Sequence, residues 1–236
     1  EDERQRIGPR VRQQRLDLVR PHSAWQPCRL NGPAPANSLV DIPAGEVRLG
    51  KPFSDSHYGW DNEYGEHHAV VPAFKAARHL VSNGEFLSFV EAGGYADDSL
   101  WSEEGRAWKD FAQASHPTFW RPDESGWRLR LLAEVVDMPW NWPVETNYHE
   151  ASAFCRWQAR TSGQAVRLPS EDEWYRLLAV SGLADISEDA PAPANIHLDH
   201  WASSCPVDYF PHGPLFDVVG NVWQWSETPI YPFDGF

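Results

Sequence analysis

Ten histidines are the first candidates for chemistry in this sequence, because imidazole is a common ligand of transition metals. His67 and His68 are adjacent and would point to opposite faces of a strand. His197 and His200 stand three residues apart beside Asp199, without a third partner at helical spacing. No HxxxH or HxE pattern occurs, so we expect solvated or hydrogen-bonded histidines and no transition-metal site built from this chain alone.

The cysteines are the next candidates. Cys28, Cys155 and Cys205 are an odd number at wide spacing, which fits neither a disulfide framework nor a CxxC zinc site and favours a reducing, cytoplasmic compartment. The sequence also lacks a GxSxG motif, a Walker-type phosphate loop and a GxGxxG motif. The commonest signals of hydrolases and nucleotide-binding proteins are therefore missing.

Charge and composition exclude two further classes. Lys and Arg number 20 against 34 Asp and Glu, and the resulting net charge of -14 repels a phosphate backbone, so we expect no nucleic-acid partner. The longest strictly apolar run, Leu177 to Val180, is far too short to span a membrane. With 13 tryptophans, 20 prolines and 16 glycines, the 236 residues predict a folded, loop-rich protein with a core of its own.

The elements that would position a site begin after residue 38. Residues 1–38 contain seven arginines and end in a proline-containing stretch, so we interpret them as a linker that leads into one domain over 39–236. Residues 40–50 predict a strand, a Pro-Ala-Gly turn and a second strand, which we interpret as a β-hairpin.

Three helices are predicted from one shared signature. Ser82, Asn147 and Ser170 are each followed three positions later by a glutamate, the pattern of a helix N-terminus in which the two side chains cap each other's backbone. We expect the helices to end at glycines, which readily adopt the left-handed conformation that closes a helix, at 93–94, 163 and 182.

Five longer blocks occur in the order of the formylglycine-generating-enzyme (sulfatase-modifying factor) family, namely 40–47, 81–89, 143–157, 167–174 and 219–225. The resemblance implies an irregular, loop-rich α+β fold, like that of C-type lectins, with short helices and small antiparallel sheets. It also implies that the C-terminal part of the domain is missing after Phe236. We interpret Trp223 and Trp225, in the last block, as core residues.

Four other segments narrow the resemblance. Residues 56–65, 116–120, 138–144 and 227–236 resemble the non-haem iron sulfoxide synthases of thiohistidine biosynthesis, first the ovothiol branch (5-histidylcysteine sulfoxide synthase) and next the ergothioneine branch. Formylglycine-generating enzymes instead rely on two reactive cysteines near the end of the domain, and this sequence has no cysteine after Cys205.

That resemblance implies a reaction in which Fe(II) and O2 couple a cysteine thiol to a carbon of a histidine imidazole and leave a sulfoxide. The small-molecule substrates would be cysteine, histidine and O2. The iron would be held by histidines of an N-terminal DinB-like domain of the same protein, outside this chain. We therefore expect this chain alone to be inactive.

The same resemblance assigns Tyr231 as the catalytic residue of this domain, which would steer the thiolate towards coupling rather than simple sulfur oxidation. Pro229 and Pro232 restrict how its ring is presented, and a phenol with a pKa near 10 is protonated at neutral pH and can donate a hydrogen bond. The alternative interpretation from spacing alone is a buried tyrosine in a proline-rich loop.

The family also implies a Ca2+ site in the loop before its GNxWEW motif, and the matching positions are Asp217, Gly220, Val222 and Gln224. Oxygen-only ligation suits this hard cation, but Gln224 stands where the family has glutamate, which removes a negative charge. A second family calcium site would begin at 195–196, with ligands that the sequence does not assign.

Two alternative functions stay open at this point. One is a non-catalytic, lectin-like ligand-binding module, because a fold does not fix a function. The other is a formylglycine-generating enzyme whose reactive cysteines would lie beyond this sequence.

Overall fold

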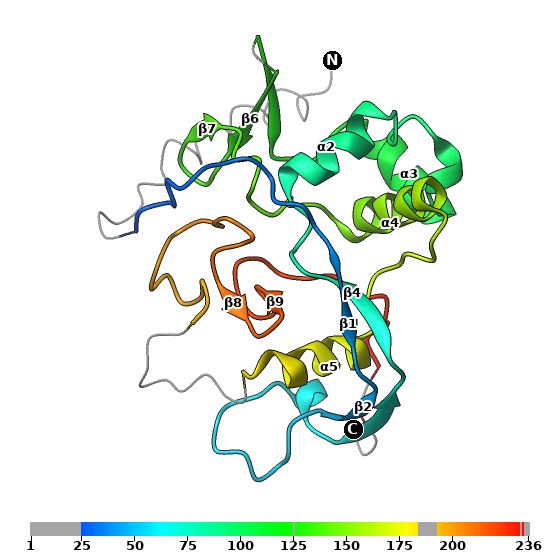
Figure 1. Cartoon of the computed structure of the whole chain (residues 1–236), viewed down its shortest axis with the longest axis vertical. Coiled ribbons are helices and arrows are strands. Elements are labelled where there is room, and N and C mark those ends of the chain that lie inside the picture. Colours follow the sequence, from blue (N-terminus) through cyan, green and yellow to red (C-terminus); the bar gives the residue numbers. More distant parts are fainter. Residues whose placement is uncertain (1–24, 125, 184–192, 232, 234–236) are drawn as a thin grey trace, which may run out of the picture.

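The computed structural model describes residues 25–124, 126–183, 193–231 and 233. It confirms the α+β architecture expected from the sequence, with short helices, small antiparallel sheets and long irregular connections. Helices α2, α3 and α4 gather at one end of the molecule, and α5 lies towards the other end (Figure 1). No helix in the described ranges is long and apolar enough to cross a bilayer.

The three predicted helices form where their caps stand. They are α2 (Asn83–Glu91), α4 (Tyr148–Ser162) and α5 (Glu171–Ser181). The Ser82 hydroxyl accepts a hydrogen bond from the Glu85 amide, while α4 and α5 each begin with the full reciprocal pair of cap bonds. Gly163 and Gly182 end α4 and α5 in the left-handed conformation, with φ of 70° and 79°.

A fourth helix, α3 (Glu103–Ala112), was not predicted. Its cap is Ser102, whose hydroxyl accepts a hydrogen bond from the Gly105 amide. Because a glycine stands where the signature has a glutamate, the pattern that identified the other three helices is incomplete here. Two single-turn helices, η1 (Asp61–Glu63) and η2 (Asp98–Leu100), complete the helical elements of the described ranges.

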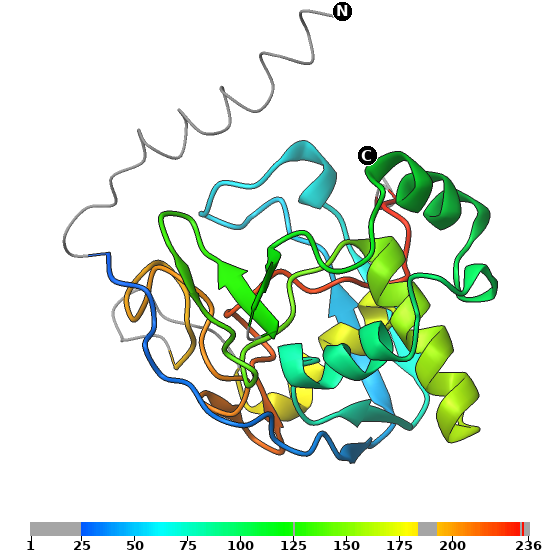
Figure 2. The same cartoon turned by 90° about the horizontal axis from the view of Figure 1, so that it is seen from above.

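The predicted hairpin at 40–50 is wrong, although both of its strands exist. Strand β1 (Leu39–Ile42) pairs antiparallel with β4 (Phe74–Ala77), and β2 (Gly45–Leu49) pairs antiparallel with β3 (His67–Val71). The chain bends rather than reverses between β1 and β2. The reason lies in α5, where the Arg176 guanidinium donates hydrogen bonds to the carbonyl oxygens of Pro43 and Ala44, at 2.9 and 3.3 Å. Helix α5 packs along the resulting ribbon, as the view from above also shows (Figure 2).

Two more small sheets complete the framework. Strands β5 (Trp120–Asp123), β6 (Gly126–Arg130) and β7 (Val135–Asp137) form a three-stranded antiparallel sheet, and β8 (Pro211–His212) pairs with β9 (Leu215–Phe216). One buried aromatic cluster lies between α2, α4 and the neighbouring loops, and its buried aromatic members are Phe86, Phe89, Tyr95, Trp101 and Phe154.

The described part of the predicted linker, residues 25–38, forms no helix or strand but contacts the domain closely. Cys28 is buried, and its amide donates a hydrogen bond to the Ser203 hydroxyl at 2.8 Å. The Trp142 indole donates to the Leu30 carbonyl, also at 2.8 Å. Residues 1–24 lie outside the described residues, so the domain boundary at residue 38 stays a prediction.

Candidate functional site

A cavity of about 660 Å³ opens between the first turns of α5 and two loops. Helix α5 contributes Glu171, Trp174 and Tyr175, and the loops contribute residues 195–197 and 218–226. We call the second loop, residues 217–226, the pocket loop. Aromatic and aliphatic side chains form most of the wall, with a carboxylate and amides at a few positions, which is the usual make-up of a small-molecule site.

Gly220 allows the pocket loop to approach the 195–197 loop. Its φ is +87°, and a Cβ built there would lie only 2.8 Å from Cγ2 of Ile196 and 3.0 Å from the Asn195 carbonyl oxygen. A larger residue would therefore clash with backbone as well as side chain. The next residue, Asn221, is also left-handed, with φ of 64°, a conformation that asparagine tolerates better than most residues.

The side-chain amide of Asn221 ties the pocket loop to the rest of the domain. Its Oδ1 accepts a hydrogen bond from the Cys205 amide at 2.8 Å, and its Nδ2 donates to the Cys205 carbonyl at 3.0 Å. The same Nδ2 also donates to Oδ2 of Asp217 at 3.0 Å. A single amide thus fixes both the position of the loop and the orientation of a buried carboxyl group.

The predicted calcium ligands do lie together, but their hydrogen bonds do not suit a cation. Asp217 is fully buried, and burial raises the pKa of its carboxyl to about 7. Its Oδ1 receives no hydrogen bond from any described residue. Gln224 turns its Nε2 inward and donates to the carbonyl oxygens of Asp217 and Val218, at 2.8 and 3.2 Å. An N–H donor therefore occupies the position that a cation would need, and this arrangement does not fit Ca2+.

The two remaining calcium positions contribute backbone only. The carbonyl oxygen of Gly220 accepts a hydrogen bond from the Val222 amide at 2.8 Å, so it is already paired within the loop. At the second predicted site, the Asn195 side chain donates to the Ser203 carbonyl at 2.8 Å. Across the described ranges, no group of three or more His, Cys, Asp or Glu residues could hold a metal ion.

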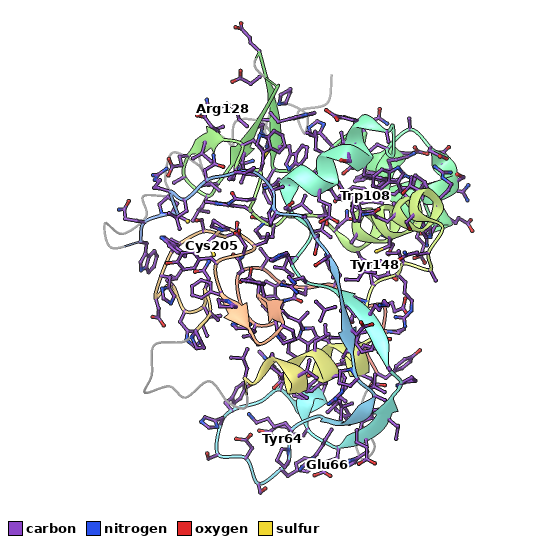
Figure 3. All side chains as sticks on the ribbon, in the orientation of Figure 1. Tyr64, Glu66, Trp108, Arg128, Tyr148 and Cys205 are labelled. Atoms are coloured by element: carbon purple, nitrogen blue, oxygen red, sulfur yellow. The ribbon has the colours of Figure 1, made fainter. Side chains whose placement is uncertain are left out.

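The prediction that Trp223 and Trp225 are core residues is wrong. Trp223 is 100% exposed and Trp225 is 49% exposed. The Trp225 indole donates a hydrogen bond to the Thr146 carbonyl at 3.0 Å, and its ring meets the edge of Tyr148 at 6.1 Å between centroids. Figure 3 shows Tyr148 on the same side of the molecule as Trp108. Within this loop the Asn221 amide donates to the buried Asp217 carboxyl, and the amide of the exposed Gln224 donates to the carbonyl oxygens of Asp217 and Val218.

Tyr231 lies on the irregular segment that follows the pocket loop, drawn in red in Figure 1. The segment crosses the start of α5, where the Glu227 amide donates to the Pro169 carbonyl at 2.9 Å and the Thr228 hydroxyl accepts from the Glu171 amide at 2.8 Å. Tyr231 is 69% exposed, so the interpretation of a buried tyrosine does not hold. It is not among the residues that line the cavity, and Pro232 lies outside the described residues.

The histidines and cysteines occupy ordinary structural positions. His67 and His68 both lie in β3, and their imidazoles face different acids, Asp172 and Glu66, each at 3.6 Å. All three cysteines are free thiols. Burial raises the pKa of the Cys155 thiol to about 11 and raises those of the other two thiols as well. Few of these groups are thiolates at neutral pH, so they are poor nucleophiles.

Sequence reasoning missed the part of the pocket that α5 supplies. Glu171, Trp174 and Tyr175 belong to the first turns of a helix that was predicted with its cap, but nothing in the sequence placed them opposite the pocket loop. The signal that could have found them is the cap itself, because residues in the first turn of a helix often face a site at its N-terminus.

Comparison with known proteins assigns the family. Residues 29–232 match the family model of the sulfatase-modifying factor enzyme 1-like domain, and the chain belongs to this family. This confirms the fold expected from the five ordered sequence blocks. The solved structure of PvdO from Pseudomonas aeruginosa is similar in fold, with a TM-score of 0.53 and 19% identity over 79% of this chain and 69% of that one.

Two kinds of curated relatives stand out. The hercynine oxygenase of Mycolicibacterium thermoresistibile is 32% identical over 209 residues, which cover 80% of this chain and 43% of that protein. The formylglycine-generating enzyme of Mycobacterium tuberculosis is 28% identical over 236 residues, which cover 82% of this chain and 75% of that protein. The chain therefore spans less than half the length of the hercynine oxygenase.

Proposed function

We propose that this chain is the substrate-side domain of an iron- and O2-dependent sulfoxide synthase, which joins the sulfur of a cysteine to the imidazole of histidine or of a histidine derivative. The observation that carries the proposal is the 30–32% identity to hercynine oxygenases from three mycobacterial species, over 80–86% of this chain. Neither the ovothiol-type nor the ergothioneine-type substrate is fixed by that similarity, although the hercynine oxygenases favour a betaine of histidine.

The pocket supports a substrate of this kind. Trp174, Tyr175, Trp223 and Trp225 all contribute to its wall, and Glu171 also lines it. Aromatic faces attract cations such as a quaternary ammonium group, and they also stack on an imidazole ring. A nearby carboxylate adds charge complementarity for a positively charged substrate.

Tyr231 is proposed as the catalytic residue of the assembled enzyme. Its phenol is exposed and is not among the residues that line the cavity, so in this proposal it would meet a reaction centre completed by another part of the whole protein, where it would donate a proton or hydrogen bond during coupling. As the resemblance implies, the iron ligands would belong to a DinB-like domain elsewhere in the whole protein.

The thiols of this chain argue against formylglycine-type chemistry in the described region. That chemistry needs a pair of reactive cysteines, whereas Cys28 and Cys205 are buried and Cys155 has a raised pKa. Burial keeps such thiols protonated and shields them from substrates.

The experiment uses the longest natural protein that carries this sequence. The protein is supplied with Fe(II), O2, cysteine or γ-glutamylcysteine, and either histidine or its trimethyl betaine, and the products are identified by mass spectrometry. We expect a sulfoxide from one imidazole substrate. The absence of a coupled product from every combination would contradict the proposed function.

The role of Tyr231 is tested separately with Tyr231→Phe in the same protein. We expect unchanged folding and iron content, with products shifted from the coupled sulfoxide towards the sulfinic acid of the thiol substrate. Tyr209→Phe, which changes a half-exposed tyrosine away from the pocket, is the matched control. A product ratio equal to that of the wild type would remove Tyr231 from the mechanism.

A further inference from the structure

A side-chain amide, that of Gln224, cross-links the pocket loop at one of the positions where the family resemblance implies a calcium ligand. The carbonyl oxygens of Asp217 and Val218 converge on Nε2 of Gln224, at 2.8 and 3.2 Å. The orientation of this amide is fixed by its partners. If the group were flipped, Oε1 would face two carbonyl oxygens and make no hydrogen bond, because all three atoms are acceptors.

The surroundings of Gln224 are rich in acceptors and poor in charge. Asp217 is buried within the loop, with Oδ2 hydrogen-bonded to Asn221 and Oδ1 free of any described donor. A cluster of inward-facing oxygens is stable only if a donor or a cation satisfies it. In this chain the Gln224 amide satisfies the two carbonyl oxygens, and Oδ1 of Asp217 keeps no described donor.

We propose that Gln224 replaces a calcium ion, so that the pocket loop keeps its shape without a bound cation, and that the single change Gln224→Glu would make the loop dependent on Ca2+. The inference concerns the stability of the loop and does not depend on the reaction proposed above. Gln224 is a positioning residue, because it shapes the loop that carries Trp223 and Trp225.

The effect of Gln224→Glu follows from the chemistry of the two side chains. A carboxylate has no hydrogen to donate, so the hydrogen bonds to Asp217 and Val218 are lost and replaced by repulsion between oxygens. Ca2+ would remove the repulsion, since it accepts ligation from the new carboxylate, from the carbonyl oxygens and from the free Oδ1 of Asp217.

The experiment measures the melting temperature of the chain in a calcium chelator and in millimolar CaCl2. We expect the wild type to melt at the same temperature in both. Gln224→Glu should melt lower by about 5 °C in the chelator and recover in CaCl2, as expected for the loss of two partly buried hydrogen bonds in a domain of this size. Gln164→Glu adds the same charge at another exposed position, outside the pocket loop, and should show neither effect.

Two outcomes would overturn the inference. One is a wild-type melting temperature that rises in CaCl2 and falls in the chelator, which would mean that Gln224 turns its oxygen towards a bound ion. The other is a Gln224→Glu variant that folds as well as the wild type and does not respond to Ca2+.

If Gln224→Glu does not fold in either condition, Gln224→Met decides, because it removes the donor without adding charge. It should lower the melting temperature equally with and without Ca2+, and an unchanged temperature would refute the role of the amide.

Discussion

The helical end of the molecule and the pocket loop are both rich in aromatic rings, but they use them in opposite ways. Between α2 and α4 the rings of Phe86, Phe89 and Phe154 are buried, and their centroids lie 5.1 to 6.0 Å apart. On the pocket loop, Trp223 has no cover within the described chain. The same residue type is therefore part of the core in one region and part of a presented surface in the other.

The difference is explained by what holds each region in place. At the helical end the buried rings pack on one another, and polar contacts such as the hydrogen bond from the Tyr95 hydroxyl to the Glu150 carboxylate lie among them. The pocket loop is held by the amides of Asn221 and Gln224, which make specific hydrogen bonds to backbone and to Asp217. Because these amides hold the loop in place, the fully exposed ring of Trp223 is available to contact a ligand or another part of the whole protein.

The largest effect should come from the buried region. Phe89→Ala removes a fully buried ring that contacts Phe86, Tyr95, Trp101 and other rings, so it should leave a cavity and lower the free energy of unfolding by about 3 to 5 kcal/mol. Urea denaturation of the chain measures the change.

The matched control for that change is Phe111→Ala on α3, where the ring is 91% exposed. Its effect on the free energy of unfolding should stay within about 0.5 kcal/mol. Equal losses at Phe89 and Phe111 would show that the helical end is not organised around the buried rings.

A smaller, pH-dependent effect should come from Asp97, which links η2 to α4 at the same end of the molecule. Hydrogen bonds from Ser99 and from the Arg160 guanidinium lower the pKa of its carboxyl from 3.8 to about 2. A carboxyl whose pKa is lower in the folded state than in the unfolded state stabilises the fold at pH values above its unfolded-state pKa. This contribution is lost as the pH falls from 3.8 to about 2.

As the pH falls through that acid range, Asp97→Asn should therefore lose less stability than the wild type. The urea midpoint, measured as a function of pH, reports this loss. Because the Asp97 side chain is about one-third exposed, with a relative accessibility of 35%, solvent screens the contribution and the difference is modest. Asp110→Asn on α3 changes the same charge at another exposed position and serves as the control. Identical pH profiles for Asp97→Asn and the wild type would mean that the contact with Arg160 does not form in solution.

The sequence predicted the local structure better than the way in which its parts meet. The caps at Ser82, Asn147 and Ser170 are local, since each depends on two residues three positions apart, and all three helices formed there. Strands β1 and β2 instead pair with β4 and β3, and the bend between them contacts Arg176, more than 130 positions away in the chain. Spacing within a short window carries no signal for such a contact.

The candidate site shows the same limit. Motif order placed Asp217 and Gln224 in one loop, and in the structure the Gln224 amide donates to the Asp217 carbonyl. Exposure could not be predicted, because tryptophan is usually buried and the sequence alone does not reveal that the side-chain amides of Asn221 and Gln224 bond to groups within this loop. The opposite wall of the pocket, from Trp174 and Tyr175, required the packing of α5.

The smallest effect on stability, and the sharpest test of the comparison, is expected from Trp223→Ala. A ring that is 100% exposed makes few contacts to lose, so the free energy of unfolding of the chain should change by no more than about 0.5 kcal/mol. In the whole protein, where Trp223 would line the substrate pocket, loss of an aromatic anchor should weaken substrate binding by about tenfold or more, seen as a higher KM.

A loss of stability close to that of Phe89→Ala would instead place Trp223 in a core, as the sequence suggested. An unchanged KM together with unchanged stability would show that the ring contacts neither the core nor the substrate. Only a Trp223→Ala variant with normal stability and weaker substrate binding fits a pocket loop that is held by side-chain amides and leaves this ring exposed to a ligand.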